Sequence, residues 1–290
     1  MLGKNGAGKS SILKAVLGLL RPATGKATVL GFDAAREPVA LRDRVGYMPE
    51  KDAAIPGLTG LEMVILAGQL SGLPAADAKQ RAHEVLYLVG LDEPRYRPVA
   101  TYSLGMKQKA KLATALVHDP DLIFLDEPTN GLDPGGRKEV LALLSDLVRK
   151  KGKSLILSSH ILSDVEALCE NVVLIDGGRV LSQGPVADLT RSSGTSFVVR
   201  ARGEVAKFEQ LLREQGFLRD VLEDATFDLH LAAGQTPQAV FEIARSQGAQ
   251  IRLLERKRRS LSDVFLDAVS RGAAESPAAG SPAAGSPAAD

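Results

Sequence analysis

After two residues the chain reads Gly3-Lys4-Asn5-Gly6-Ala7-Gly8-Lys9-Ser10. Three glycines in this run let backbone N–H groups converge on one point without obstruction by side chains. Apolar residues at helical spacing follow from 12 to 20 and stop before Pro22, so the positive end of a helix dipole points into the same space. This pattern is typical of a phosphate-binding loop, in which Lys9 reaches the β- and γ-phosphates and the Ser10 hydroxyl coordinates Mg²⁺. The plainer alternative is a glycine-rich turn that only starts a helix.

The composition restricts the kind of protein this chain is. Its 290 residues include 36 Lys and Arg against 35 Asp and Glu, a formal net charge of +1, with 44% hydrophobic residues and one cysteine. The apolar fraction excludes bulk disorder, the single Cys169 excludes a disulfide scaffold, and the charge balance argues against a nucleic-acid partner. No apolar run reaches the roughly 18 residues that span a bilayer, and residues 1–4 begin no apolar signal segment. We therefore expect a soluble, cytoplasmic protein whose membrane role comes through a partner.

Strand and helix patterns alternate over residues 1–190. Unbroken apolar runs at 122–125, 155–157 and 172–175 are typical of strands buried on both faces, and segments with helical spacing lie between them. The alternation predicts the α/β fold class, with a mostly parallel sheet flanked by helices. Residues of about 57–118 have helical patterns throughout, which predicts a helical subdomain inserted into the α/β order.

Reactive side chains follow two of these predicted strands. Asp126 and Glu127 end the first apolar run, and His160 follows the second. The carboxyl ends of parallel strands form the edge at which α/β folds bind ligands. Beside a phosphate loop, Asp126 is placed to hold the Mg²⁺ shell, Glu127 to polarise the attacking water and His160 to donate to a γ-phosphate oxygen. The alternative is two solvated acids and a structural histidine.

One more segment, Tyr102-Ser103-Leu104-Gly105-Met106, precedes a helix that is predicted to run to about His118. Ser103 is placed as the N-cap of that helix, and the alternatives are a plain cap and a second helix start that faces phosphate. Together with the glycine loop, the acidic strand end and His160, in this order, the segment makes the chain resemble the ATP-binding subunit of an ABC transporter. The resemblance covers about residues 1–190 and implies a P-loop NTPase-type sheet.

The resemblance extends to the named motifs of that family. Residues 3–10 resemble its Walker A loop, 102–106 its LSGGQ signature, 122–127 its Walker B strand, 131–133 its D-loop, 158–160 its H-loop and 45–50 its Q-loop, with Glu50 where Gln is usual. The resemblance implies that nucleotide is bound by Gly3, Asn5, Gly6, Ala7, Gly8, Lys9, Ser10, Ser11, Ser103, Gly105 and Asp133. It implies Mg²⁺ at Ser10, Asp126 and Glu50, and catalysis by Glu127 and His160.

A composite site follows from the resemblance. Two copies of the cassette would pair head to tail, with ATP between the Walker A loop of one and the signature of the other, so that Ser103 and the Gly105 backbone touch the γ-phosphate held by Lys9 of the second copy. One complete motif set favours two identical copies. The helical insertion resembles the subdomain that touches an integral membrane permease on a separate chain. This places the cassette peripherally on the inner face of the cell membrane, and cargo contacts in the permease.

The remaining residues predict two further segments. Residues 195–271 have α/β patterns and resemble the small C-terminal extension of cassettes that serve bacterial two-component exporters of drugs, antibiotics or polysaccharide. The ending Ser260-Leu261-Ser262-Asp263-Val264-Phe265 fits that subgroup. Residues 272–290 repeat Ser, Pro, Ala and Gly and are expected to be disordered, because they cannot bury enough apolar area to offset chain entropy.

Two alternatives to an active exporter ATPase remain open. Only Met1 and Leu2 precede the loop, whereas the family has a strand and an adenine-stacking aromatic before it; this suggests a miscalled start or a truncated, non-hydrolysing paralogue with weak ATP binding. A non-transport ABC-type clamp on DNA or the ribosome is the second alternative. The interval from Ser10 to Ser103 is too short for the long coiled coil of DNA-repair relatives, and ribosomal relatives carry two cassettes per chain. An ATPase that powers export is therefore the favoured interpretation.

Overall fold

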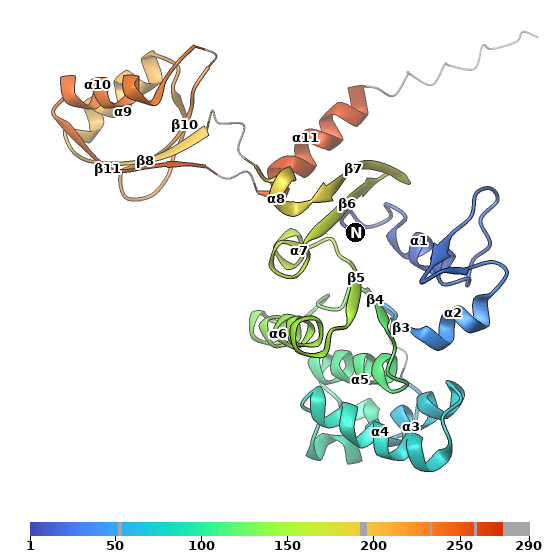
Figure 1. Cartoon of the computed structure of the whole chain (residues 1–290). Coiled ribbons are helices and arrows are strands. Elements are labelled where there is room, and N and C mark those ends of the chain that lie inside the picture. The colour runs from blue at the N-terminus through green and yellow to red at the C-terminus, as the bar shows by residue number, and fades with distance from the viewer. Residues whose placement is uncertain (52–53, 192–195, 233, 258–259, 275–290) are drawn as a thin grey trace, which may run out of the picture. The chain divides into compact units, whose positions relative to one another are not determined.

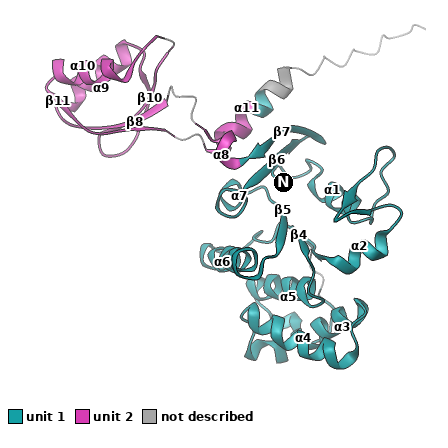
Figure 2. Ribbon diagram, viewed as in Figure 1, with its two compact units in different colours: residues 1–185, 268–290 teal, residues 186–267 magenta. Residues whose placement is uncertain are grey.

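The chain forms two compact units (Figure 2), residues 1–185 with 268–290 and residues 186–267. The computed structural model describes residues 1–51, 54–191, 196–232, 234–257 and 260–274. Over these residues no helix combines the length and the apolar character needed to cross a bilayer.

Three parallel strands make the sheet of the first unit (Figure 1), in the order β3 (Val45–Met48), β4 (Leu122–Asp126), β5 (Ser154–Ser158). All five residues of β4 are buried, as its unbroken apolar run predicts. In register, Leu125 pairs with Met48 on one side and with Leu157 on the other. The predicted α/β sheet is confirmed, and its strands end together at one edge.

Leu2, which directly precedes the glycine loop, pairs with the chain at that same edge. It makes parallel bridges with Ser159, directly after β5, and with Leu174. Its N–H donates to the carbonyl of Val173 at 2.9 Å, and its carbonyl accepts from the N–H of Ile175 at 2.8 Å. Residues 3–10 therefore begin between the end of β5 and the strand that contains Val173 to Ile175.

Leu174 and Ile175 belong to β6 (Asn171–Asp176), which pairs with β7 (Arg179–Pro185) in an antiparallel hairpin. The turn residues Gly177 and Gly178 have φ values of 52° and 76°, a region that L-residues rarely adopt. Glycine at both positions therefore permits the tight turn of this hairpin.

The helix after the loop, α1 (Lys9–Val16), is shorter than its apolar spacing predicts. The chain turns at Gly18, which has φ 69° and lies so close to the Ala34 carbonyl that a Cβ would be 2.3 Å from the oxygen. The predicted end beside Pro22 is therefore wrong, and Leu19 and Leu20 are exposed. The other elements of this α/β part are β1 (Thr28–Val29), β2 (Phe32–Asp33), α2 (Pro38–Arg44), α6 (Pro134–Lys151) and α7 (Leu162–Leu168).

Residues between β3 and β4 are largely helical. Helices α3 (Gly60–Leu70), α4 (Ala75–Leu88) and α5 (Leu104–Leu116) pack against one another. The short 3₁₀ turns η1 (Glu93–Tyr96) and η2 (Val99–Thr101) lie between α4 and α5. Small residues such as Ala78 and Ala82 are fully buried and allow close packing of the helices. Thr59 and Glu62 form a capping box at the start of α3.

The second unit is a β-α-β-β-α-β arrangement with one antiparallel sheet in the order β11-β8-β10-β9, which is a ferredoxin-like topology. The two helices pack on one face, where Phe208 and Phe227 meet edge to face with ring centroids 5.7 Å apart. Its elements are α8 (Val186–Leu189), β8 (Ser196–Gly203), α9 (Val205–Glu214), β9 (Leu218–Val221), β10 (Thr226–His230), α10 (Pro237–Ser246) and β11 (Ala249–Arg256).

The chain continues into α11 (Leu261–Ala274), whose first turn has a cap in which Ser260 and Asp263 exchange hydrogen bonds. Residues 272–274 are helical, so disorder does not begin at 272 as expected. The repeated Ser, Pro, Ala and Gly segment at 275–290 lies outside the described residues.

Candidate functional site

The glycine loop has the backbone that its sequence requires. Gly6 and Gly8 have φ values of 81° and 100°. Gly8 is the N-cap of α1 and carries no side chain to cap it, so the first N–H groups of the helix are left for another acceptor. Gly3 lies against β6 so closely that a Cβ would be 2.2 Å from the carbonyl oxygen of Ile175. The loop thus lies at the sheet edge, where the Gly3 and Ala7 N–H groups are hydrogen-bonded to the carbonyls of Ser159 and Lys4 and the start of α1 has no side-chain cap.

Lys9 is buried beneath this loop, at 6% exposure. Its ammonium donates to the carbonyl oxygens of Gly3 at 2.7 Å and Lys4 at 3.2 Å. It also lies 3.1 Å from Oε1 of Glu127, whose side chain is equally inaccessible. The Lys9 ammonium, at the start of α1, therefore contacts both the glycine loop and Glu127, which follows β4.

Glu127 stands in strained backbone directly after β4, with φ 52°. Its Oε2 lies 2.8 Å from Nδ1 of His160 and accepts a hydrogen bond from the His160 backbone N–H at 3.3 Å. Its Oε1 is buried and has no aligned hydrogen-bond donor among the described residues, so the contact with Lys9 is purely ionic. The carboxylate is therefore held by one oxygen and has acceptor capacity left on the other.

Asp126 ends β4 one residue earlier and is also buried. Its Oδ1 accepts a hydrogen bond from the Ser158 hydroxyl at 2.6 Å. Nearby on β3, burial raises the pKa of Tyr47, and the charges of Asp126 and Glu50 raise it further. The edge of the sheet is therefore an acidic environment that a bound cation would neutralise.

A second group of predicted residues lies at two other helix starts. Ser103 is the N-cap of α5, as predicted, and accepts from the N–H of Met106 at 3.3 Å. Asp133 caps α6 by accepting from Gly136 at 3.3 Å. The two helix starts touch: a Cβ on Gly131 would lie 2.9 Å from Leu104, so the signature and the D-loop form one packed surface. Asn5, Ser11, Glu50, Ser103 and Asp133 are exposed.

The structure adds a buried polar cluster beneath the site that the sequence did not reveal. Asp164, 1% exposed, accepts from the Thr129 hydroxyl at 2.5 Å and from Nε of Arg137 at 2.6 Å. Arg137 also donates to the Ser163 hydroxyl. The cluster joins the segment after Glu127 to the helix after His160. Nothing in the local pattern marks it, because its members come from three separate segments.

These groups fit a nucleoside triphosphate with Mg²⁺. The bare helix start and Lys9 are donors for phosphate, and Oε1 of Glu127 has acceptor capacity for a water molecule. Ser10, Asp126 and Glu50 supply the oxygen ligands that Mg²⁺ prefers. Within the described part of the chain no three His, Cys, Asp or Glu side chains are grouped for a metal.

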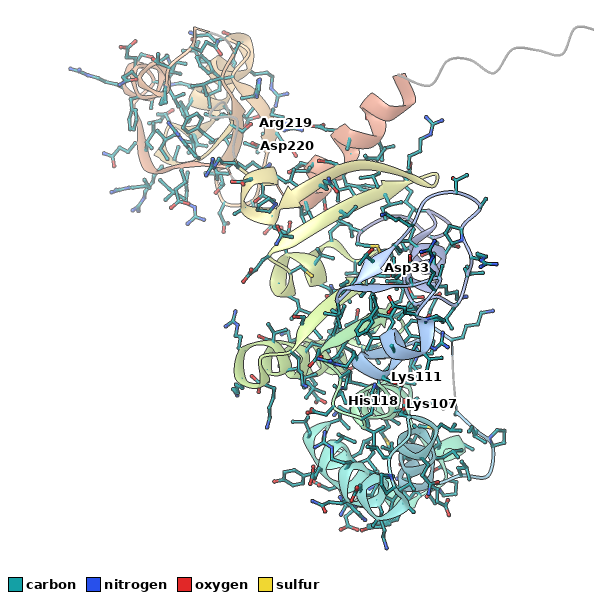
Figure 3. The ribbon with its side chains drawn as sticks, turned by 45° about the vertical axis from the view of Figure 1, so that its right-hand side comes forward. Asp33, Lys107, Lys111, His118, Arg219 and Asp220 are labelled. Carbon is teal, nitrogen blue, oxygen red and sulfur yellow. The ribbon has the colours of Figure 1, made fainter. Side chains whose placement is uncertain are left out.

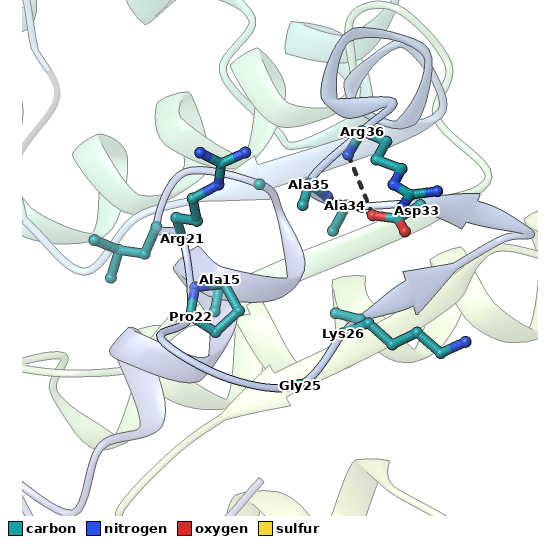
Figure 4. Close-up of a pocket in the computed structure, with 12 residues that line it drawn as sticks. Ala15, Arg21, Pro22, Gly25, Lys26, Asp33, Ala34, Ala35 and Arg36 are labelled. Carbon is teal, nitrogen blue, oxygen red and sulfur yellow. Dashed lines mark hydrogen bonds between the residues drawn. The ribbon is translucent and has the colours of Figure 1, made fainter.

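A hollow of about 440 Å³ lies elsewhere, between the end of α1 and β2 (Figure 4). Arg21, Lys26 and Arg36 contribute to its wall, and Asp33 accepts from the N–H groups of Ala35 and Arg36. No residue of the glycine loop lines it, so it is separate from the candidate site.

The sequence is similar to those of known ABC transporter ATP-binding proteins. The ABC transporter family profile matches residues 1–130, and that of the ATP-binding protein DrrA1-3-like C-terminal domain matches residues 184–269. An uncharacterized ABC transporter ATP-binding protein of Nostoc sp. is 34% identical, over 93% of this chain and 79% of that protein. The daunorubicin/doxorubicin resistance ATP-binding protein DrrA of Streptomyces peucetius is 39% identical, over 70% of this chain and 61% of that protein.

Solved structures agree as well. An ATP-binding subunit of an ABC transporter superposes with a TM-score of 0.58 and 34% identity, covering 66% of this chain and 79% of that one. The chain therefore belongs to the family of ABC transporter ATP-binding proteins, which are ATPases, and carries a DrrA1-3-like C-terminal domain.

Proposed function

We propose that the chain binds and hydrolyses ATP to power export through a separate membrane permease. The observation that carries the proposal is the contact of Lys9 with Glu127 and of Glu127 with His160 beneath the glycine loop. A phosphate-binding cation, a carboxylate with acceptor capacity and an imidazole meet there, which is the set of groups that NTP hydrolysis requires.

In this proposal each of these groups has its own role. The loop N–H groups and Lys9 bind the phosphates, and Ser10, Asp126 and Glu50 would hold Mg²⁺, which neutralises charge on the phosphate oxygens when it is bound. Lys9 then exchanges its contact with Glu127 for phosphate. This leaves Glu127 to orient a water molecule and accept its proton, while His160 holds the carboxylate in place and donates toward the γ-phosphate.

A second copy of the cassette completes the site in this proposal. Ser103 and Asp133 are exposed at the touching starts of α5 and α6, and two helix N-termini suit an anion presented by another molecule. We assign residues 1–190 to the cassette and 195–271 to the accessory domain. The helical segment of about 57–118 is assigned to contact with the permease at the inner face of the membrane. Export, rather than import, is supported by the DrrA relative, which is named for drug resistance.

The test measures ATP binding, ATP turnover and oligomeric state of the full chain. Glu127→Gln should lower turnover by roughly 10²-fold or more and leave ATP binding unchanged, because only the proton acceptor is lost. The same variant should dimerise with ATP and Mg²⁺, whereas Lys9→Ala should neither bind nor dimerise. Unchanged turnover in Glu127→Gln would remove Glu127 from this role, and a monomer at saturating ATP would refute the shared site. Coexpression with a candidate exporter permease, followed by ATP-dependent transport of a drug into inverted vesicles, tests export.

A further inference from the structure

Helix α5 carries a lysine on its buried face. Lys111 is 5% exposed, and its neighbours Ala110, Leu112 and Ala113 are fully or almost fully buried. Its ammonium donates to the carbonyl oxygens of Pro49 at 2.8 Å and of Glu50 at 2.9 Å. Figure 3 shows Lys111 in the region where α5 lies against the central sheet.

Burying the Lys111 ammonium has an unfavourable desolvation free energy. Removing an ammonium from water is unfavourable unless good acceptors replace the water, whereas an apolar side chain of similar length would pack without that penalty. Here the acceptors are consecutive carbonyls of the chain that leaves β3. Those carbonyls cannot all face one point unless the backbone bends around the ammonium. Lys111 therefore fixes the path of residues 49–50.

The same helix also holds a second loop. Nε2 of Gln108, one turn earlier on the buried face of α5, lies 3.4 Å from the carbonyl oxygen of Asn130 and donates to it. The first residue of α5 contacts Gly131, and the helix begins at the Ser103 cap. One rigid element thus connects the signature start, the segment at 130–131 and the backbone of Glu50.

We propose that Lys111 is a positioning residue for Glu50: it ties the Glu50 backbone to α5, so that the Glu50 carboxylate and the signature start keep a fixed spacing. This inference rests on the proposed function, in which Glu50 contributes to the Mg²⁺ shell. A side chain that acts on a ligand residue rather than on the ion changes metal affinity by about tenfold or more when it is removed.

The experiment compares Lys111→Met, which keeps the length and removes the donors, with Lys111→Arg, which keeps the charge. Lys109→Met is the matched control, because Lys109 lies on the same helix and pairs with Glu139 at 2.9 Å, whereas the hydrogen bonds to residues 49 and 50 come from Lys111. Amide hydrogen exchange of nucleotide-free full chain is the first readout. Lys111→Met should exchange about tenfold faster at residues 46–51, with α3 and β4 unchanged, and Lys111→Arg should restore much of the protection.

The second readout is the Mg²⁺ concentration that gives half-maximal ATP turnover at saturating ATP. Lys111→Met should raise it about tenfold, with a smaller effect on maximal rate, and Lys109→Met should not change it. In a Glu50→Ala background, Lys111→Met should add no further change, because the carboxylate it positions is gone. A full tenfold change in that background would overturn the proposal, as would unchanged exchange at 46–51. Absence of turnover in the unmutated chain would instead refute the proposed function, while the exchange readout would still test the tether.

Discussion

The ammonium of Lys9 lies 3.1 Å from Oε1 of Glu127, and both side chains are almost inaccessible to solvent. Each charge is compensated by the other, so under the proposed function a phosphate that enters the loop would compete with Glu127 for the same cation. Phosphate binding and release of the carboxylate would then be one exchange, which would couple occupancy of the loop to the availability of the proposed proton acceptor.

Lys9→Ala should abolish ATP binding and also destabilise the fold, because Glu127 loses the cation beside it. Loss of one partner of a buried ion pair costs about 3–5 kcal/mol. Adding Glu127→Gln should recover most of that stability without restoring binding, since the uncompensated charge is removed. Urea unfolding and nucleotide titration measure the two effects separately. Lys14→Ala, an exposed change on the same helix, should affect neither. Equal stability of the single and double variants would contradict the coupling.

Two glycines of the candidate site should respond oppositely to alanine. Gly3→Ala places a Cβ 2.2 Å from the Ile175 carbonyl oxygen, so we expect a loss of about 2 kcal/mol or more in the free energy of unfolding. The nearest atom to a Cβ on Gly105 is 3.9 Å away, an ordinary contact, and helical alanine is favoured over glycine by about 0.5–1 kcal/mol.

Gly105→Ala should therefore fold at least as well as the unmodified chain but lose turnover, if its backbone faces the nucleotide of a second copy. Chemical unfolding and ATPase assays of both variants decide this. Full activity in a stable Gly105→Ala protein would remove Gly105 from the proposed shared site.

The sequence predicted the parts of the molecule that local pattern determines. The apolar run of β4 and the N-cap at Ser103 both have local causes, and they are found where they were expected. The end of α1 was wrong because tertiary contact at Gly18 overrides the apolar spacing. β9 was not predicted, because three of its four residues are exposed and its sequence lacks alternation.

The sequence predicted the site residues that follow strands, but not the polar contacts between distant segments. Asp126, Glu127 and His160 follow strands whose parallel register brings them to one edge. The Asp164 cluster depends on contacts between residues 27 to 35 positions apart, for which a single sequence has no signal. The buried contact of Lys111 does have a signal in the sequence. Lys111 is the single charged residue from Ala110 to Leu116, and its neighbours in that run are small or apolar. A lysine inside such a run indicates a buried polar contact.

Asp164→Ala should destabilise the first unit by about 3 kcal/mol, because the buried Thr129 hydroxyl and the Arg137 guanidinium lose their shared acceptor. Asp146→Ala is the control. Asp146 pairs with Lys150 on the exposed face of α6, and such surface pairs contribute under about 1 kcal/mol. Unfolding by urea compares the two, and similar losses would show that the buried cluster contributes no more than a surface pair.

His118 should make the stability of the first unit depend on pH. Burial lowers the pKa of His118 below its ordinary value; the carbonyl of Val45, 3.1 Å from Nε2, acts in the opposite direction. Nδ1 is buried and has no hydrogen-bond partner in the described structure, so the protonated ring would bury an unpaired donor. Because the folded-state pKa is depressed, the stabilising contribution is complete above the unfolded pKa of about 6.5 and is lost as pH falls through the folded value.

Between about pH 7.5 and pH 5.5, the free energy of unfolding should therefore fall more in the unmodified chain than in His118→Gln, whose amide can still donate to Val45 but cannot titrate. His230→Gln is the matched control, because His230 is exposed at the end of β10 and belongs to the second unit. Carboxylates that begin to titrate near the lower pH contribute equally to all three proteins and cancel in the comparison. Urea unfolding at several pH values, followed by a probe in the first unit, measures the difference. An identical pH dependence in His118→Gln and the unmodified chain would show that the buried ring is not the titrating group.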